Sequence, residues 1–405
     1  MDPYFSELGR SVYAYWKKEN FSASAFPAIA QKALKKSPPS AHVDLHEFIR
    51  KFLLEDEQPF QTSSGFGQPE LIVHDNPMFY IQLLFWMDGT TDIHQHGFSG
   101  AFHVMTGSSI HTEFQFKNAH PVTARFRTGD LCLKSTRLLE TGSTVPILSG
   151  SGCIHSLFHL ETPSVTVVIR THSDPGTDPQ FTYLPPHIAV DPVHQDSLTM
   201  RRKQLLDILE GTDHPAYAKL VRQMIVELDF ERGFFILQNC VRHLHALGAW
   251  ENAWSAYVKK HGRMALRVKP TLEEIIRRDG MVAMRATIED VEHRFFLALL
   301  LNVTQRRDLF TMVAKRYPGD ARKTILRWME ELLVSDGMGI SLLDFVFPEA
   351  LGVSPEEQPM VFLTSLKYLL KGGKPMAREK VLSGQKLALF KNTLQHSSLG
   401  ILLNP

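Results

Sequence analysis

The stretch MDGTTDIHQHGFSGAFHVMTG, residues 87–107, decides how the rest of the chain is interpreted. Side chains of an extended segment alternate between its two faces, so His94 and His96 point the same way and can hold one ion from adjacent pleats. Gly89 before the pair, and Gly97 and Gly100 after it, allow the backbone to turn on either side of a short strand. The pattern therefore predicts a metal site on this strand.

A second stretch, SGSGCIHSLFH at residues 149–159, supplies a third histidine. A turn of small residues leads into a strand that carries His155. We expect His94, His96 and His155 to be the metal ligands. Cys153 and His159 share the strand face of His155 and are predicted to lie beside the site, where they could support the ligands.

The order of these motifs resembles the two-part signature of the cupins, over about residues 69–173. A cupin usually places a Glu four or five residues after the histidine pair, where this chain has Gly100 and Ala101. The missing carboxylate is similar to the thiol dioxygenases and other three-histidine cupins. The resemblance implies a β-barrel (jelly roll) in which neutral imidazoles alone hold Fe(II).

Within that superfamily, the chain is similar to the cysteine dioxygenase branch. The run FYIQLLFW at residues 79–86 precedes the histidine pair, and His159 and Pro163 follow His155 in the order of that branch. The cross-linking Cys of the branch is absent near Gly100. No Arg occurs between Arg50 and Arg125, where the branch carries the Arg that binds the substrate carboxylate. We therefore expect that free cysteine is not the substrate.

Four further residues are candidate catalytic groups. The active-site Tyr of the cysteine dioxygenase branch falls on His172, and the nearby Arg170 occupies another position where the branch keeps active-site groups. Strand alternation counted from Ala101 predicts that His103 points inward, as a fourth ligand or a hydrogen-bond donor. His159, on the strand face of His155, completes the set.

Three neutral imidazoles leave a divalent ion its full charge and open positions for substrate and dioxygen. This favours a non-haem iron-dependent oxygenase of the dioxygenase type, with dioxygen as co-substrate. Nickel, copper, zinc and manganese are the alternative metals. A non-catalytic metal- or ligand-binding sensor and a non-redox isomerase or lyase are the alternative functions.

The composition bounds the class of protein. The chain has 405 residues, with 44 Lys and Arg against 43 Asp and Glu, and a formal charge of +1. It therefore lacks the sustained positive electrostatic field that would attract nucleic acid or an anionic membrane. No apolar run is long enough to span a bilayer, and no signal segment opens the chain, so a cytoplasmic location is expected. Three widely spaced cysteines predict no disulfide framework.

The changes in sequence pattern predict an α+β multidomain protein. Helical periodicity covers residues 1–60, short strands follow in 61–173, residues 174–196 have the proline-rich composition of a linker, and 197–405 read as an all-α C-terminal domain. We expect that domain to pack near the open end of the barrel, and the proline-rich segment to carry Tyr183 or His187 toward the metal site. A small molecule or a peptide is the expected substrate. The helical domain is the candidate surface for self-association or a protein partner.

Overall fold

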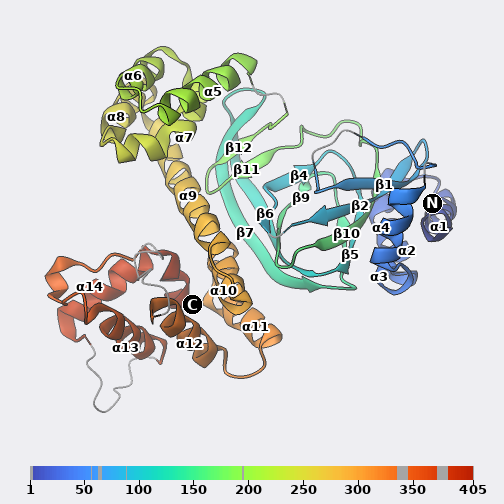
Figure 1. Cartoon of the computed structure of the whole chain (residues 1–405). Helices are drawn as coiled ribbons and strands as arrows, with labels where there is room; N and C mark the ends of the chain where they lie inside the picture. The colour runs from blue at the N-terminus through green and yellow to red at the C-terminus, as the bar shows by residue number, and fades with distance from the viewer. Residues whose placement is uncertain are drawn as a thin grey trace. The chain divides into compact units, whose positions relative to one another are not determined.

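The computed structural model describes residues 3–55, 57–62, 66–87, 89–193, 196–334, 345–371 and 382–404. Helices precede and follow a block of strands (Figure 1). The elements are α1 (Pro3–Lys18), α2 (Phe26–Lys36), α3 (Pro39–His42), α4 (Leu45–Leu54), β1 (Glu70–Asp75), β2 (Phe79–Trp86), β3 (Gly89–Thr90), β4 (Ile93–His96), β5 (Gly100–Thr106), β6 (Ser108–Pro121), β7 (Phe126–Glu140), β8 (Thr144–Ile147), β9 (Gly150–His159), β10 (Ser164–Thr171), β11 (Thr182–Leu184), β12 (Ile188–Val190), α5 (Ser197–Gly211), α6 (Tyr217–Glu227), α7 (Phe230–Ala246), α8 (Trp250–His261), α9 (Arg263–Ala286), α10 (Val291–Asn302), α11 (Arg306–Arg316), α12 (Ala321–Val334), α13 (Gln358–Leu370) and α14 (Gly384–Gln395).

The chain divides into two compact units. The first holds residues 1–109, 113–134 and 139–276, and the second holds 277–405 together with the short pieces 110–112 and 135–138. The strands and the N-terminal helices thus belong mainly to the first unit. The predicted α+β architecture, a barrel flanked by helices and followed by a helical region, is confirmed.

Two antiparallel sheets form the barrel of the first unit. One has the strand order β1-β2-β10-β5-β8, and the other has the order β3-β9-β4-β11-β12-β7-β6. Strands distant in sequence are neighbours, because β10 pairs with both β2 and β5, and β9 pairs with β4. This interleaved order brings residues 94–96 and 155 together.

The first sheet is covered on both faces. Alternate side chains of β2, β5 and β10, such as Ile81, Ala101 and Val167, face α1, α2 and α4 in one apolar cluster. Their neighbours, such as Leu84 and Val168, face the barrel interior in another cluster. Figure 1 shows the N-terminal helices against the outer face of this sheet. Because both faces are buried, the strands are apolar almost throughout.

Local signals explain where helices begin. The carboxylate of Asp44 accepts a hydrogen bond from the backbone N–H of Glu47 at 2.8 Å, so Asp44 caps the N-terminus of α4.

Residues 174–196 differ from the linker that their composition suggests. They contain β11, which pairs with β4, and β12, which pairs with β7. Pro185 and Pro186 occupy the turn between these strands, where their missing N–H groups remove no ladder hydrogen bond. Strands of three residues are too short to produce a recognisable alternation.

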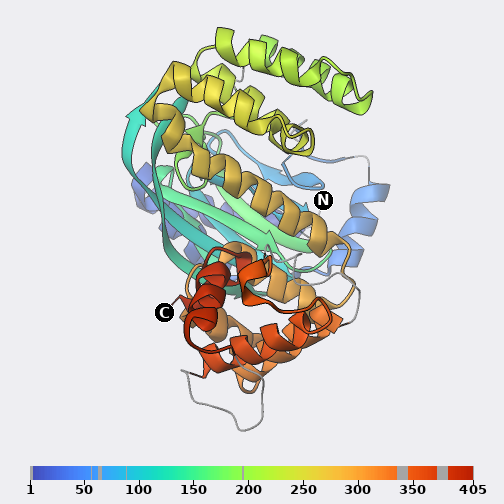
Figure 2. The ribbon, with the colours of Figure 1, turned by 90° about the vertical axis from the view of Figure 1, so that its left-hand side faces the viewer.

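Helices α5–α8 and the first part of α9 share one apolar core with the barrel strands. Phe126, Ile188 and Val190 are buried among side chains of these helices. Arg267 of α9 also forms an ion pair with Asp130 of β7 at 3.1 Å. Figure 2 gives a second view of these helices. This core is separate from the cluster that lines the barrel interior.

The second unit is helical apart from its two short pieces of β6 and β7. Phe345, Phe362 and Phe390 form an aromatic cluster, with ring centroids 4.9–5.6 Å apart. Nowhere in the described ranges does a helix combine the length and the apolar character needed to cross a bilayer.

Candidate metal centre

The strand register places the three histidines together. His94 on β4 lies directly opposite His155 on β9, and a register shift between His94 and His96 brings Gly150 opposite His96. His94 and His96 keep the shared face predicted from their spacing. The pairing of β4 with β9 therefore brings the three imidazoles close to one another.

The three imidazoles are close enough to hold one ion. One ring nitrogen from each lies within 4.8 Å of the others, and Nε2 of His96 is 2.9 Å from Nε2 of His155. All three side chains are buried. In the described part of the chain, no Asp, Glu or Cys joins the group.

Hydrogen bonding and burial set the state of these rings. His94 Nδ1 lies 2.7 Å from the carbonyl oxygen of Asp92, to which it donates. Its Nε2, which has no partner among the described residues, is left with a free lone pair. Burial lowers the pKa of His94. Burial, and then the nearby His94 and Arg170, holds the pKa of His96 well below its usual value. Both rings are neutral near pH 7, as metal ligation requires.

The donor set fits a divalent transition metal. Two nitrogens bound about 2.1 Å from an ion and at a right angle are about 3.0 Å apart, and the Nε2 atoms of His96 and His155 are 2.9 Å apart. Neutral imidazoles suit iron, copper, nickel and zinc. The three-histidine site could therefore bind a metal.

A cavity of about 40 Å³ opens beside the imidazoles. Its described lining is aromatic and aliphatic, with two threonines, one glutamine and no charged carboxylate, ammonium or guanidinium group. The lining residues are Phe66, Gln82, Leu84, Trp86, Thr91, His94, His96, Phe98, Phe102, Ile147, His155, Leu157, Thr166 and Val168.

Comparison with known proteins finds likeness in structure only. No protein-family model matches the sequence, and no curated protein does. Among solved structures, the chain is similar to KdgF from Halomonas sp. (17% identity, 30% of this chain and 94% of the other, TM-score 0.21). It is also similar to the DMSP lyase DddQ from Ruegeria pomeroyi (17%, 44% and 95%, TM-score 0.24). A third is a hydroquinone 1,2-dioxygenase from Sphingomonas sp. (12%, 27% and 68%, TM-score 0.21).

The arrangement of strands and histidines defines the fold of this part of the chain. Two antiparallel sheets close a barrel, and a histidine pair on β4 meets a third histidine on β9 inside it. Residues 70–190 form a cupin-like barrel. The fold expected from the sequence is thus confirmed, and its reaction is a separate question.

His103 does not lie in the cupin cavity, contrary to its predicted inward orientation. It shares the outer face of β5 with Ala101 and Met105, which pack against the N-terminal helices. Its Nδ1 lies 2.8 Å from Thr144 Oγ1, and its Nε2 lies 2.9 Å from Ser40 Oγ. The prediction was wrong because both faces of β5 are apolar, so the apolar face does not mark the interior.

His159 lies on the strand face of His155 but behind the cavity wall. Its ring stacks on Trp86 with a centroid distance of 4.7 Å, and its Nδ1 lies 3.0 Å from Ser109 Oγ. Burial lowers the pKa of His159 to about 3. It can support Trp86, which lines the cavity, and its own role in catalysis stays a prediction.

Arg170 and His172 lie toward one end of β10. The guanidinium of Arg170 covers the ring of Phe98 at 3.3 Å from the centroid and donates to the backbone carbonyl oxygens of Thr171 and His172. His172 is half exposed and its Nε2 lies 2.7 Å from the carbonyl oxygen of Asn76, on the β1–β2 turn. The ring of Phe98 separates Arg170 from His96, whereas His172 faces away from the cavity.

Tyr183 and His187 do not reach the metal centre. The Tyr183 hydroxyl donates to Gln95 Oε1 at 2.5 Å, on the opposite face of β4 from His94. His187 Nδ1 lies 3.0 Å from the carbonyl oxygen of Gly129. Cys153 is half-buried at the start of β9.

Phe66 and Gln82 are two lining residues that no pattern in the sequence singled out. Phe66 is 38% exposed, and its ring lies edge-on to Trp86 at 5.2 Å and to His94 at 5.9 Å. Gln82 is 1% exposed and interrupts the apolar run of β2. The only sequence signal for this position was the presence of one amide side chain within an otherwise apolar strand.

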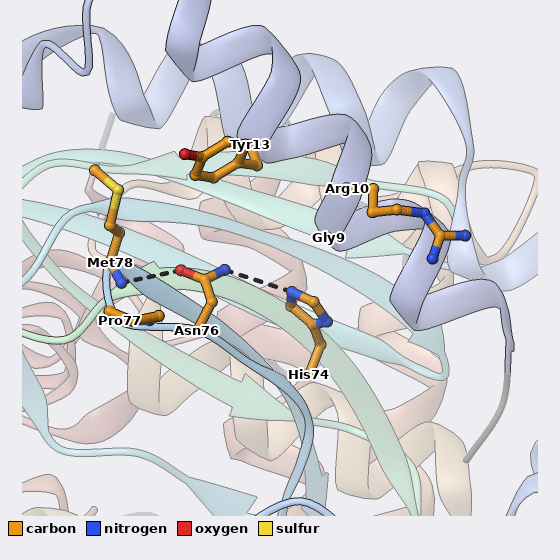
Figure 3. Close-up of a pocket in the computed structure, with 7 residues that line it drawn as sticks. All are labelled: Gly9, Arg10, Tyr13, His74, Asn76, Pro77 and Met78. Carbon is orange, nitrogen blue, oxygen red and sulfur yellow. Dashed lines mark hydrogen bonds between the residues drawn. The ribbon is translucent and has the colours of Figure 1, made fainter.

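A second hollow, of about 420 Å³, lies on the outside of the barrel between α1 and the β1–β2 turn. Figure 3 shows His74 and Asn76 beneath Gly9 of α1, with Tyr13 and Met78 at one side. Asn76 Nδ2 lies 3.4 Å from His74 Nε2, and Asn76 Oδ1 accepts from the Met78 N–H. Its polar groups mainly serve the turn, and it contributes no residue to the three-histidine group.

Proposed function

We propose that this protein is a non-haem iron-dependent oxygenase that uses dioxygen to oxidise a small organic substrate inside the cupin barrel. The observation that carries the proposal is the meeting of three buried imidazoles without a carboxylate in the described part of the group. Such a donor set favours an ion with open positions for two further ligands. Fe(II), when bound, would supply the redox chemistry with dioxygen.

The residues of the chain have three tasks in this proposal. His94, His96 and His155 would hold the ion, and the carbonyl oxygen of Asp92 orients the ring of His94. The apolar lining excludes bulk water from the reacting atoms. Trp86 is fixed by a hydrogen bond of 3.1 Å from its Nε1 to Thr166 Oγ1, so one cavity wall is rigid.

The lining also bears on the substrate. Free cysteine carries a carboxylate that needs a cation, and no Arg or Lys lines the described part of the cavity. The nearest candidate, Arg170, covers Phe98 and donates to backbone carbonyl groups. The lack of a carboxylate, tyrosine or lysine in the described lining also offers little general-base machinery to a non-redox lyase.

The test combines metal analysis with oxygen dependence. Purified protein should contain about one divalent metal per chain, and Fe(II)-loaded protein should consume oxygen with a suitable substrate and stop under anaerobic conditions. Turnover that continues without oxygen would instead identify an isomerase or a lyase. Tight metal binding without oxygen consumption across a broad substrate panel would favour the sensor.

A further inference from the structure

The side chain of Gln82 is a buried amide whose oxygen has no hydrogen-bond partner within the described ranges. Gln82 is 1% exposed, lies on the inner face of β2 and lines the cavity beside the imidazoles. Among the described residues, no group pairs with its Oε1. A buried polar atom left unpaired destabilises the folded protein, so its retention in the wall of a cavity points to a ligand.

Gln95 provides the contrast within the same barrel. It is also 1% exposed, but its Nε2 donates to the carbonyl oxygen of Pro179 at 2.8 Å and its Oε1 accepts from the Tyr183 hydroxyl at 2.5 Å. Gln95 is thus a satisfied structural amide. Gln95 therefore has a structural role, whereas the amide oxygen of Gln82 is available to bind a ligand.

The surroundings of Gln82 define what it could bind. The wall beside it contains the aromatic rings of Phe66, Trp86, Phe98 and Phe102, and no charged side chain lines the described cavity. A charged substrate would lose its hydration without a partner, whereas an aromatic ring matches these walls. A hydroxyl group both donates and accepts, so it suits the amide in either orientation.

We propose that Gln82 is the specificity-determining residue for the substrate, and that the substrate is a small, uncharged hydroxyaromatic compound. One oxygen of this compound would approach the metal, and a second hydroxyl would bond to the Gln82 amide. This inference rests on the proposed metal site and extends it to a substrate class. Cavities that hold benzene measure about 150 Å³, so the present 40 Å³ requires the half-exposed Phe66 to move on binding.

The experiment compares probes on zinc-loaded protein, in which no oxidation consumes them. Phenol, catechol, resorcinol and hydroquinone are titrated by calorimetry into the wild-type protein and into Gln82→Leu, which keeps the size of the side chain and removes its hydrogen bonds. We expect at least one dihydroxybenzene to bind the wild type about tenfold more tightly than phenol does. In Gln82→Leu that preference should fall to less than about threefold. An unchanged preference, or no binding of any probe to metal-loaded wild type, would overturn the inference.

Two further readouts distinguish the possible failures. Metal content should be equal in the wild type and Gln82→Leu; a wild type that binds no metal contradicts the proposed function itself, and the inference falls with it. Thermal unfolding should give Gln82→Leu a midpoint no lower than that of the wild type, because no internal bond is lost. Gln95→Leu, which breaks two internal bonds, should lower the midpoint. If Gln82→Leu lowers it as much, Gln82 is structural and the inference is wrong.

Discussion

At the scale of single residues, the ligand set makes the first prediction. His155→Ala removes one of three imidazoles and should lower the metal content from about one per chain to below about one tenth. His159→Ala is the matched control, because His159 is buried on the same strand face four residues later but lies behind Trp86. It should keep its metal. Elemental analysis after dialysis measures both, and full occupancy in His155→Ala would refute the assignment.

Phe66 makes the second prediction at this scale. Phe66 is 38% exposed, and its ring lies edge-on to the imidazole of His94 at a centroid distance of 5.9 Å. Phe66→Ala should therefore speed removal of bound metal by a chelator several-fold. The loss of folding free energy should be only about 1 kcal/mol, because a partly exposed ring buries little area. Stopped-flow chelation gives the rate, and Leu157→Ala, which changes the inner wall, serves as the comparison.

The sequence could identify the three histidines that meet in the barrel but not the rest of the cavity lining. His94 and His96 follow from strand alternation and His155 from a turn motif, and the structure brings all three together. His103 was misplaced because side-chain alternation cannot distinguish the two faces of a strand buried on both sides. The importance of Gln82 emerges only from the structure, in which no described group pairs with its Oε1.

At the scale of secondary-structure elements, the contact between α1 and β1 makes a third prediction. A Cβ added to Gly9 would lie 2.2 Å from His74 Nε2, a contact that Figure 3 lets the reader follow. Gly9→Ala should therefore destabilise the protein by about 1–3 kcal/mol through overpacking. In a His74→Ala background the same change should stabilise it by up to about 1 kcal/mol, since alanine is the better helix former. Denaturant unfolding of the four proteins tests this reversal of sign.

The packing of β5 under the N-terminal helices makes a fourth prediction. Burial lowers the pKa of His103 to about 4, from an ordinary value of 6.5. Between these pH values the unfolded chain binds a proton that the folded chain does not, so stability falls as the pH drops through this range. The full effect is about 3 kcal/mol. His103→Gln should lose less stability between pH 6.5 and 4 than the wild type, as urea unfolding would show; parallel pH curves would contradict it.

Element prediction succeeded where strands are long and failed where they are short. β2 was recognisable from its run of aromatic and aliphatic residues, and the helices of residues 1–60 from their periodicity. β11 and β12 span three residues each and adjoin prolines, so composition suggested a linker. Their existence depends on partners in β4 and β7, which no local pattern contains.

At the scale of the whole molecule, the core shared by barrel and helices makes a fifth prediction. A fragment ending at residue 196 would expose Phe126, Ile188 and Val190, which α5–α9 bury in the full chain. Burial of each such side chain contributes about 1.5–3 kcal/mol. We expect residues 1–276 to stay soluble and hold metal, residues 1–196 to aggregate, and residues 60–196 to be the least stable. Solubility and metal content of the three fragments test this ranking of stability. A soluble, metal-loaded 60–196 fragment would contradict it.

The pairing of β4 with β9 has a consequence for how the chain matures. His96 and His155 are 59 residues apart in sequence, and a slip of one residue between the two strands would turn His155 to the opposite face of the sheet. A misaligned chain would then offer the ion two imidazoles, and only the aligned chain offers three. In the proposed function, an ion would be retained only by molecules whose strands have found their correct partners, so metal binding would select the correctly folded chains.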